Sequence, residues 1–383
     1  MFKDTVKFIR EQFEVPIEFI PLHEPRFIGK EREYVMDAID STFVSSVGKY
    51  VDKFEEIVSK KSGARYAIAT SNGTSALHIA LLMAGVQPND EVITQPLTFV
   101  ATGNAISYAN ARCVFLDVDI DTMGLSPSKL KIFLEANAEL RDGVAYNKKT
   151  NAKLAACMPM HTFGFPCRID EIVTICNKFN IPVVEDAAES LGSLYKGKYT
   201  GTFGKLGVYS FNGNKTITSG GGGVIITDDE KLAKLAKHIT TTAKVAHPWE
   251  YEHDMIGYNY RMPNLNAALA CAQLEQLDSF INNKRELALI YEEFFKEKSI
   301  KFVLENSDSH SNYWLMTIIL KDLEERNDFL KFTNNHKVMT RPIWKLMNKL
   351  DMFKDCQVED ITNAEWLEER VVNITSSVRV NKL

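Results

Sequence analysis

Lys215 is the residue of this sequence whose surroundings best suit covalent catalysis. It ends the segment 210–215 (SFNGNK), which follows an apolar run, and four consecutive glycines occupy 220–223. A lysine on such an open loop can reach a buried aldehyde and, once desolvated, form a Schiff base with it. Most lysines are solvated surface charges, and we give that interpretation to Lys198 and Lys205, which lie in a polar segment punctuated by glycine.

Two further segments carry residue types that a flat, phosphorylated cofactor requires. The turn 71–76 (SNGTSA) joins a predicted strand to a predicted helix, where free backbone N–H groups can bind phosphate. The segment 185–190 (EDAAES) follows an apolar strand, and Asp186 in it could keep a ring nitrogen protonated. Taken alone, the first segment is better explained as an ordinary helix N-cap. The second is equally compatible with a helix N-terminus that has acidic residues in its first turn. Their order along the chain, with Lys215 last, favours a single cofactor site.

The elements that must position these residues alternate between strand and helix patterns from about residue 60 to 230. Helical patterns at 74–84 and 169–179 separate several of the apolar runs. This order predicts an α/β domain with a mostly parallel sheet buried on both faces. Seven runs are predicted as strands: 66–70, 91–94, 113–116, 154–158, 182–185, 207–211 and 223–227.

The pattern changes after Pro263. The elements predicted there are a long helix, a strand, a second helix and a short strand, at 265–296, 313–320, 324–336 and 371–374. This change predicts a smaller α+β domain. At the other end, apolar residues at helical spacing predict an amphipathic N-terminal helix. We therefore divide the chain into a helical extension, a large domain and a small domain, at 1–20, 21–274 and 275–383.

The composition restricts the class of protein. Of 383 residues, 45% are hydrophobic and 25% charged, and the net charge of -5 is spread along the chain, which argues against a nucleic-acid partner. No apolar run approaches the ~20 residues that cross a bilayer, so no membrane partner is expected. The six cysteines form no C-x-x-C pair, which predicts neither a metal site nor a disulfide framework. A reducing, cytoplasmic location is therefore expected.

Five segments together resemble the DegT/DnrJ/EryC1/StrS family of sugar aminotransferases, which use pyridoxal 5′-phosphate (PLP). They are SNGTSAL (71–77), TFVATGNAI (98–106), EDAAES (185–190), SFNGNK (210–215) and GYNYRMPNLNAAL (257–269). The resemblance extends over nearly the whole chain. It implies the fold type I of PLP-dependent aminotransferases, with a seven-stranded, mostly parallel sheet in the large domain and a smaller α+β C-terminal domain. It also implies a homodimer whose active sites are shared between subunits.

The resemblance assigns roles to eight residues. Lys215 would form the Schiff base and then shuttle a proton between the sugar and the cofactor. Asp186 would pair with the pyridine nitrogen and keep it protonated, so that the ring acts as an electron sink. The other implied contacts are Thr74, Ser75 and Ser210 with the phosphate, Asn259 with the phosphate of the other subunit, Phe99 with the ring face, and Glu189 with the ring hydroxyl. We assign no chemical role to His161, although it follows a predicted strand.

Three segments, at 21–31, 41–55 and 339–350, resemble the subgroup that aminates C4 of UDP-4-keto-6-deoxy-N-acetylglucosamine for legionaminic-acid-type surface sugars. This resemblance implies a nucleotide sugar and L-glutamate as substrates. A basic cluster in and just after the first segment, Arg26, Lys30 and Arg32, would either meet the diphosphate or remain solvated.

Two alternatives stay open. One is an aminotransferase for a different nucleotide-linked ketosugar. The other is a non-catalytic regulator of the same fold that senses PLP or a sugar, although the chain has no basic stripe of the kind that DNA binding requires. The family also contains dehydratases with histidine in place of the Schiff-base lysine, and Lys215 argues against that activity.

Overall fold

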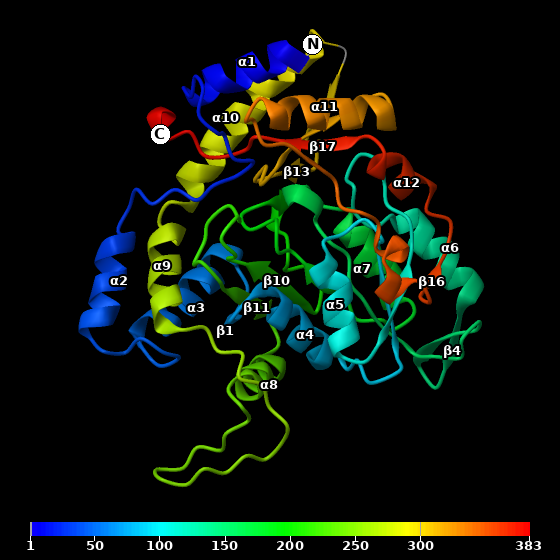
Figure 1. Ribbon diagram of the computed structural model, residues 1–383. Coiled ribbons are helices and arrows are strands. Elements are labelled where there is room, and N and C mark those ends of the chain that lie inside the picture. The colour runs from blue at the N-terminus through cyan, green and yellow to red at the C-terminus, as the bar shows by residue number, and fades with distance from the viewer. Residues whose placement is uncertain (1, 299) are drawn as a thin grey trace.

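The computed structural model describes residues 2–298 and 300–383, and its centre is one large sheet (Figure 1). The strand order is β1-β11-β10-β7-β6-β2-β3-β16, with parallel bridges at Cys157–Val183 and Met160–Asp186 joining its two halves. Neighbouring strands are parallel except at β11, which is antiparallel to β1 and β10. The strands are β1 (Tyr66–Thr70), β2 (Glu91–Thr94), β3 (Arg112–Phe115), β6 (Leu154–Cys157), β7 (Val184–Asp186), β10 (Leu206–Ser210), β11 (Gly223–Thr227) and β16 (Gln357–Val358).

Helices cover both faces of this sheet because its strands are apolar on both sides. Val208 and Ile225 pack with α4, whereas their neighbours Tyr209 and Ile226 pack on the opposite face, with α9. The first face carries α4 (Gly73–Ala84), α5 (Val100–Tyr108) and α8 (Glu230–Thr240), and the second carries α3 (Lys49–Ser62), α6 (Pro127–Asn137), α7 (Ile169–Asn177) and α9 (Asn264–Leu274). The predicted fold class is confirmed, and β16 adds a short edge strand that the sequence did not predict.

A second, antiparallel sheet has the order β12-β14-β17-β15 and packs against α10 and α11. Its elements are β12 (Lys301–Phe302), β14 (Met316–Ile319), β15 (Arg341–Pro342), β17 (Val371–Ile374), α10 (Leu277–Lys296) and α11 (Leu323–Asn335). The predicted amphipathic helix is present as α1 (Phe2–Phe13), which lies on its own subunit. The Phe8 ring stacks on Phe294 of α10 at 3.9 Å, and Phe2 meets Phe329 of α11 edge-on at 5.3 Å.

Shorter elements complete the fold. They are α2 (Glu31–Asp40), α12 (Thr362–Glu368), the hairpin β4 (Ala138–Arg141) and β5 (Val144–Asn147), and the small sheet of β8 (Leu194–Tyr195), β9 (Lys198–Tyr199) and β13 (Ser309–His310). Among the helices of the described residues, none is long and apolar enough to cross a membrane.

Two predicted elements differ from the structure. The single helix expected over 265–296 is two helices, because the chain breaks between α9 and α10 at 275–276. The strand expected over 313–320 is shorter, since regular pairing begins only at Met316. Tyr313 has a φ of 45°, in the left-handed region, which places the residues before β14 in a bend where they can leave the sheet.

Glu185 ties the loop after β9 to the end of β7. Its buried carboxylate accepts N–H groups from Gly201 at 2.7 Å and from Phe203 and Gly204 at 2.6 Å. It also lies 3.0 Å from Nε2 of the buried His161, whose Nδ1 accepts the Cys167 N–H at 3.2 Å. His161 is thus a core residue whose two ring nitrogens both have hydrogen-bond partners.

We predict that Glu185→Gln lowers the free energy of unfolding by about 3 kcal/mol or more. The glutamine side chain would place its own N–H group against backbone N–H groups, and these would be left in the core without an acceptor. The melting temperature should fall by several degrees. The matched control is Glu56→Gln, which removes an exposed pair with Lys60 on α3 and should change stability by less than about 1 kcal/mol. Equal melting temperatures for the two variants would contradict the prediction.

Candidate active site

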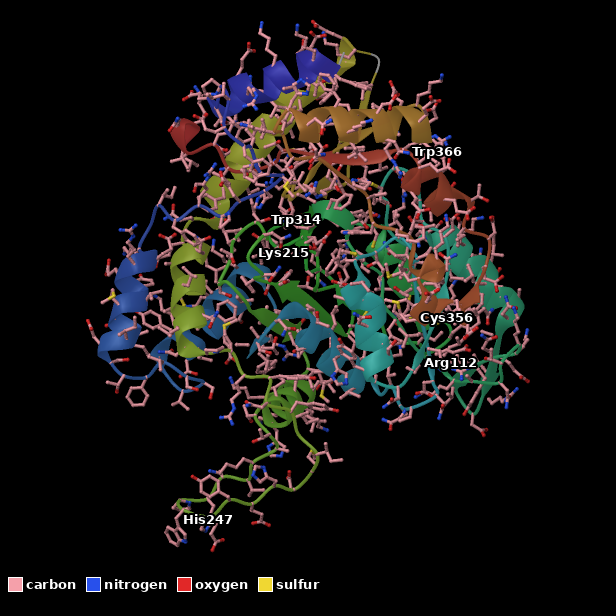
Figure 2. The ribbon with its side chains drawn as sticks, viewed as in Figure 1. Arg112, Lys215, His247, Trp314, Cys356 and Trp366 are labelled. Carbon is pink, nitrogen blue, oxygen red and sulfur yellow. The ribbon has the colours of Figure 1, made fainter. Side chains whose placement is uncertain are left out.

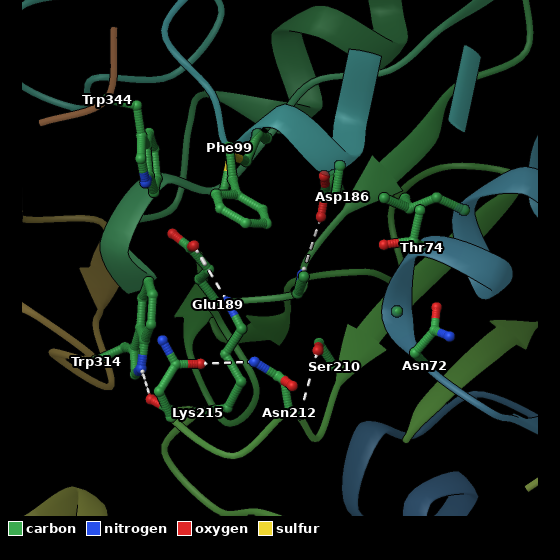
Figure 3. Close-up of a pocket in the computed structure, with 16 residues that line it drawn as sticks. Asn72, Thr74, Phe99, Asp186, Glu189, Ser210, Asn212, Lys215, Trp314 and Trp344 are labelled. Atoms are coloured by element: carbon green, nitrogen blue, oxygen red, sulfur yellow. Dashed lines mark hydrogen bonds and ion pairs between the residues drawn. The ribbon is translucent and has the colours of Figure 1, made fainter. Parts of the chain in front are cut away.

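One cavity of about 290 Å³ opens where β1, β7 and β10 end (Figure 3). These three strands run in the same direction, so the loops that follow them meet at one edge of the sheet, the usual ligand site of such sheets. The lining residues are Asn72, Gly73, Thr74, Leu77, Phe99, Ala101, Met160, Asp186, Ala188, Glu189, Ser210, Asn212, Asn214, Lys215, Trp314 and Trp344.

The N-terminus of α4 forms one end of the cavity. Asn72 caps the helix by accepting the Ser75 N–H at 2.8 Å, which leaves Thr74 on the cavity wall. Gly73 lies so close to Ser210 that a Cβ at this position would stand 2.9 Å from the serine Cβ. The sequence therefore uses glycine where the turn and the end of β10 converge. First-turn N–H groups and two hydroxyl side chains together suit a phosphate group.

Asp186 is buried at the end of β7, with an exposed fraction of 2%. Its Oδ2 accepts the hydroxyl proton of Thr102 at 2.7 Å, and its Oδ1 accepts the N–H of Ala188 at 3.2 Å. Burial raises the pKa of this carboxyl, and the two hydrogen bonds oppose that rise. A buried carboxyl held in this way is suited to bind a cationic ring N–H.

Lys215 enters the cavity from the loop after β10 and meets two groups. Its Nζ lies 3.2 Å from Oε1 of Glu189 and 3.9 Å from the centre of the Trp314 ring. The indole is itself held by a 2.7 Å hydrogen bond from its Nε1 to the carbonyl of Asn214. The ammonium group is thus fixed between a carboxylate and an aromatic face, on the side of the cavity opposite α4 (Figure 3).

Glu189 is almost completely enclosed, with 1% of its side chain exposed. Burial raises its pKa to about 7, although Lys215 and the N–H of Phe163, which donates to Oε2 at 2.9 Å, oppose the rise. This carboxyl can therefore hold or release a proton near neutral pH beside the lysine.

An aromatic wall, defined here as Phe99, Phe163, Trp314 and Trp344, borders one side of the cavity. Phe99 and the two tryptophans line the cavity, and Phe163 packs against both tryptophans. Phe163 lies 4.8 Å from Trp344 and 6.4 Å from Trp314 between ring centres, and Phe99 lies 6.2 Å from Trp344. Phe99 keeps 47% of its surface exposed, so its ring is available to stack on a flat ligand.

The polar and charged groups that line this cavity match the chemical groups of PLP. The α4 N-terminus with Thr74 and Ser210 would hold the phosphate, Asp186 the pyridine nitrogen and Phe99 one ring face, with Lys215 within the same cavity. When bound, PLP supplies an aldehyde for the lysine and a ring that accepts electrons.

Six of the eight residues predicted from the sequence line this cavity, and two do not. Ser75 lies one position further along α4, where its hydroxyl meets that of Ser71 at 3.3 Å. Asn259 is exposed and pairs with Thr241 at the base of a loop outside the cavity. The basic residues at 26, 30 and 32 also lie outside the cavity lining.

Sequence reasoning missed Trp314, Trp344, Thr102 and Asn72. Trp314 was included in a predicted strand, and Trp344 lies in a segment quoted only for its subgroup resemblance. Thr102 falls inside the quoted segment 98–106, one helical turn after Phe99. That spacing of three residues, on a helix whose N-terminus meets the site, was the available signal for a second contact.

The fold and the cavity together define a PLP-dependent aminotransferase of fold type I. The chain belongs to the DegT/DnrJ/EryC1/StrS aminotransferase family, whose model matches residues 26–382. This membership confirms the predicted enzyme class and cofactor.

Individual relatives cover almost the same length. The chain is 38% identical over 360 residues to a GDP-perosamine synthase of Escherichia coli O157:H7, covering 94% of each protein. It is 36% identical over 338 residues to the putative pyridoxal phosphate-dependent aminotransferase EpsN of Bacillus subtilis, covering 87% of this chain and 84% of that protein. The fold superposes with a TM-score of 0.85 on the PMP form of the putative sugar aminotransferase Spr1654 of Streptococcus pneumoniae, at 22% identity and 95% and 94% coverage.

We predict that Glu189→Gln makes the cofactor-free protein more stable than the wild type at pH 8 but not at pH 5. The folded carboxyl keeps its proton up to about pH 7, whereas in the unfolded chain it ionises near its ordinary value of 4.5. Wild-type stability is therefore lost as pH rises between these values, by on the order of 1–3 kcal/mol. Glutamine resembles the protonated acid and carries no such loss.

Urea unfolding of both proteins at the two pH values measures this difference. Glu139→Gln is the control, since it changes an exposed carboxylate beside Arg141. A difference between Glu189→Gln and the wild type that does not grow with pH would contradict the prediction.

Proposed function

We propose that this protein transfers an amino group from L-glutamate to C4 of a nucleotide-linked 4-keto-6-deoxy sugar. The observation that carries the proposal is the placement of Lys215 Nζ between Glu189 and Trp314, in a cavity that also holds Asp186 and the α4 N-terminus. We also propose that it acts in the cytoplasm, where nucleotide sugars are made.

Each residue has a defined task in this proposal. Lys215 accepts a proton from the carbon that bears the amino group of glutamate and returns one to C4 of the sugar. Asp186 keeps the ring nitrogen protonated. Glu189 stabilises the ammonium group that Lys215 becomes once it has accepted this proton. The buried setting of both carboxyls keeps water away from these charges.

The aromatic wall supports a deoxysugar as the acceptor. A 6-deoxyhexose carries a methyl group at C5 in place of a hydroxymethyl group, and its apolar edge can pack on Trp314 or Trp344 without leaving a hydroxyl unpaired. The wall stands beside Lys215, so a sugar resting on it would present its ring carbons to Nζ.

The nucleotide is the point on which the comparisons change our expectation. The sequence suggested UDP-4-keto-6-deoxy-N-acetylglucosamine, whereas the relative that shares 38% identity is named a GDP-perosamine synthase. We therefore propose GDP-4-keto-6-deoxymannose as the first acceptor to assay, with the UDP-linked sugar as the second.

We further propose a homodimer in which each cavity is completed by the loop 241–263 of the partner. This loop projects from the body below α8 (Figure 1). Three large apolar side chains on it are almost bare, with Trp249 76%, Tyr251 83% and Ile256 87% exposed. Such a set on one projection suits a protein contact, and it carries Asn259 at its base.

The test of the function is the visible absorbance of the purified protein with PLP, before and after L-glutamate. A visible band that bleaches with glutamate supports the amino-donor half of the reaction. Each ketosugar is then added in turn, and recovery of the band together with a new aminosugar supports the second half. A band that resists glutamate would favour another donor or the sensing regulator, and the absence of a band would overturn the proposal.

We predict that Lys215→Ala lowers turnover by several orders of magnitude, because the change removes the covalent attachment and the proton carrier together. Lys205→Ala is the control, since Lys205 is exposed and lies outside the cavity lining. Aminosugar formation is measured for both variants with the accepted ketosugar. Near-normal turnover of Lys215→Ala would refute the mechanism.

We predict that subunit exchange between the Lys215→Ala and Asn259→Ala variants produces sites with wild-type affinity for PLP, which neither variant has alone. In a mixed dimer, one cavity receives Lys215 from one subunit and Asn259 from the other, so it is complete. PLP titration of the exchanged mixture, followed by absorbance, should show a tight class of sites that neither parent has. If Asn259 serves its own subunit, this class will not appear.

A further inference from the structure

Two thiols meet at the edge of the larger sheet, outside the cavity lining. The edge strand β16 pairs with β3 in parallel register, with Gln357 opposite Val114 and Val358 opposite Phe115. Continuing this register by one residue places Cys356 opposite Cys113. Both side chains belong to the same apolar cluster, with Cys113 buried in it and Cys356 half-buried at its margin.

The backbone geometry permits a covalent bond between them. Neighbouring strands lie about 4.8 Å apart, and paired residues project from the same face of a sheet. Disulfides join residues whose Cα atoms are about 4.4–6.8 Å apart. Cys356 stands just before β16, in a bend that follows the turn of the 3-10 helix Asp351–Phe353, so its backbone is not held by strand pairing on both sides.

Only one of the two thiols is partly exposed, since Cys113 is buried and Cys356 is half-buried. The Cys113 thiol and backbone N–H, together with Arg112, lower the pKa of Cys356 to about 7, although its partial burial opposes this. The hydrogen bond with Cys356, together with burial, raises the pKa of Cys113 well above its usual range. Figure 2 shows Arg112 and Cys356 together at this edge of the molecule. A low-pKa thiol that solvent reaches, beside a second thiol, has the arrangement of a peroxide-reactive site.

The other cysteines provide a contrast within the same chain. Cys157, Cys167 and Cys176 also lie together, but all three are completely buried in the core between the sheet and α7, and Cys271 is buried under α3. Proximity alone therefore does not distinguish the pair at β16. The pair at β16 differs because one of its thiols, Cys356, is partly exposed and also has a second thiol beside it.

We propose that Cys356 is an oxidation site for hydroperoxides and that Cys113 resolves it as an intramolecular disulfide. The Cys356 thiolate attacks a peroxide oxygen, so that an S–O bond forms, the O–O bond breaks and hydroxide or alkoxide leaves. The Cys113 sulfur then displaces water from the sulfenic acid and gives up its thiol proton. The two sulfurs together lose two electrons, and the peroxide gains them.

The disulfide would tether the segment between Trp344 and Cys356, which extends from the edge of the larger sheet to the cavity lining. Between Trp344 and Cys356 the chain donates the Met347 N–H to the Pro96 carbonyl at 2.9 Å. It also presses the Phe353 ring on Gly103 of α5, where a Cβ would stand 2.7 Å from the ring. Helix α5 begins after Phe99 and carries Thr102. The segment between Trp344 and Cys356 therefore contacts the chain at Pro96 and at Gly103, which lie before and after these two residues in the sequence.

The test treats the PLP-loaded protein with hydrogen peroxide and maps its peptides without reduction. We expect one cross-linked peptide pair that contains Cys113 and Cys356, lost on addition of dithiothreitol. Before oxidation, iodoacetamide should label Cys356 at least about tenfold faster than any other cysteine. The matched control is Cys176→Ser, which removes a buried thiol from the second group and should leave the cross-link unchanged.

Two single variants separate the roles. Cys356→Ser should abolish peroxide-dependent change at Cys113, whereas Cys113→Ser should let Cys356 proceed to the sulfinic acid, because the resolving thiol is missing. Slow labelling of Cys356, or its oxidation to sulfinic acid in the wild type without a cross-link to Cys113, would overturn the proposal. PLP binding by each variant shows that the protein is folded.

Discussion

Three carboxyl groups lie buried within five residues of one another, at Glu185, Asp186 and Glu189, and the site is arranged around the compensation of their charge. Glu185 is compensated by backbone N–H groups and His161. Glu189 is compensated in part by Lys215, and burial raises its pKa to about 7. Asp186 receives only a hydroxyl and one N–H, and no ion pair with it occurs among the described residues. A buried carboxylate without a cation is costly, so a protonated ring nitrogen is the counter-charge that this position lacks.

The second sheet also helps to compensate the charges in the cavity, because the segment before its strand β14 provides groups that surround Lys215. Asn312 donates to the carbonyls of Glu189 and Leu191 at 2.9 Å and accepts the Trp314 N–H at 2.8 Å. One amide thus fixes the acidic segment and the indole relative to each other. The bend before β14 thus keeps Trp314 outside the strand, with its ring 3.9 Å from the Lys215 ammonium group.

The sequence predicted those parts of the site that follow strands of the larger sheet, since strand ends and their polar loops are visible in a local pattern. Lys215 and Asp186 were singled out in this way, and the turn 71–76 was marked as a phosphate site. The individual roles of Thr74, Ser210, Phe99 and Glu189 came from the family resemblance. Trp314 and Trp344 depend on how the second sheet docks, which no local pattern records. The break between α9 and α10 was missed for a related reason, because Glu275 and Gln276 keep helical spacing on both sides. The domain limits at 20 and 274 stay predictions, and β16 shows that the C-terminal region also contributes to the first sheet.

The position of Lys215 also explains why a carboxyl and an indole are both needed beside it. In the proposed reaction Lys215 would pass between attachment to PLP and a free amino group. A lone carboxylate would favour the ion so strongly that the covalent state would be disfavoured, whereas a lone apolar wall would do the reverse. Glu189, with a pKa near neutrality, can lose or keep its own charge as the lysine changes, and the indole attracts the cation without requiring a counter-ion. The two groups together therefore give Lys215 a charged contact at 3.2 Å and an aromatic contact at 3.9 Å in the same cavity.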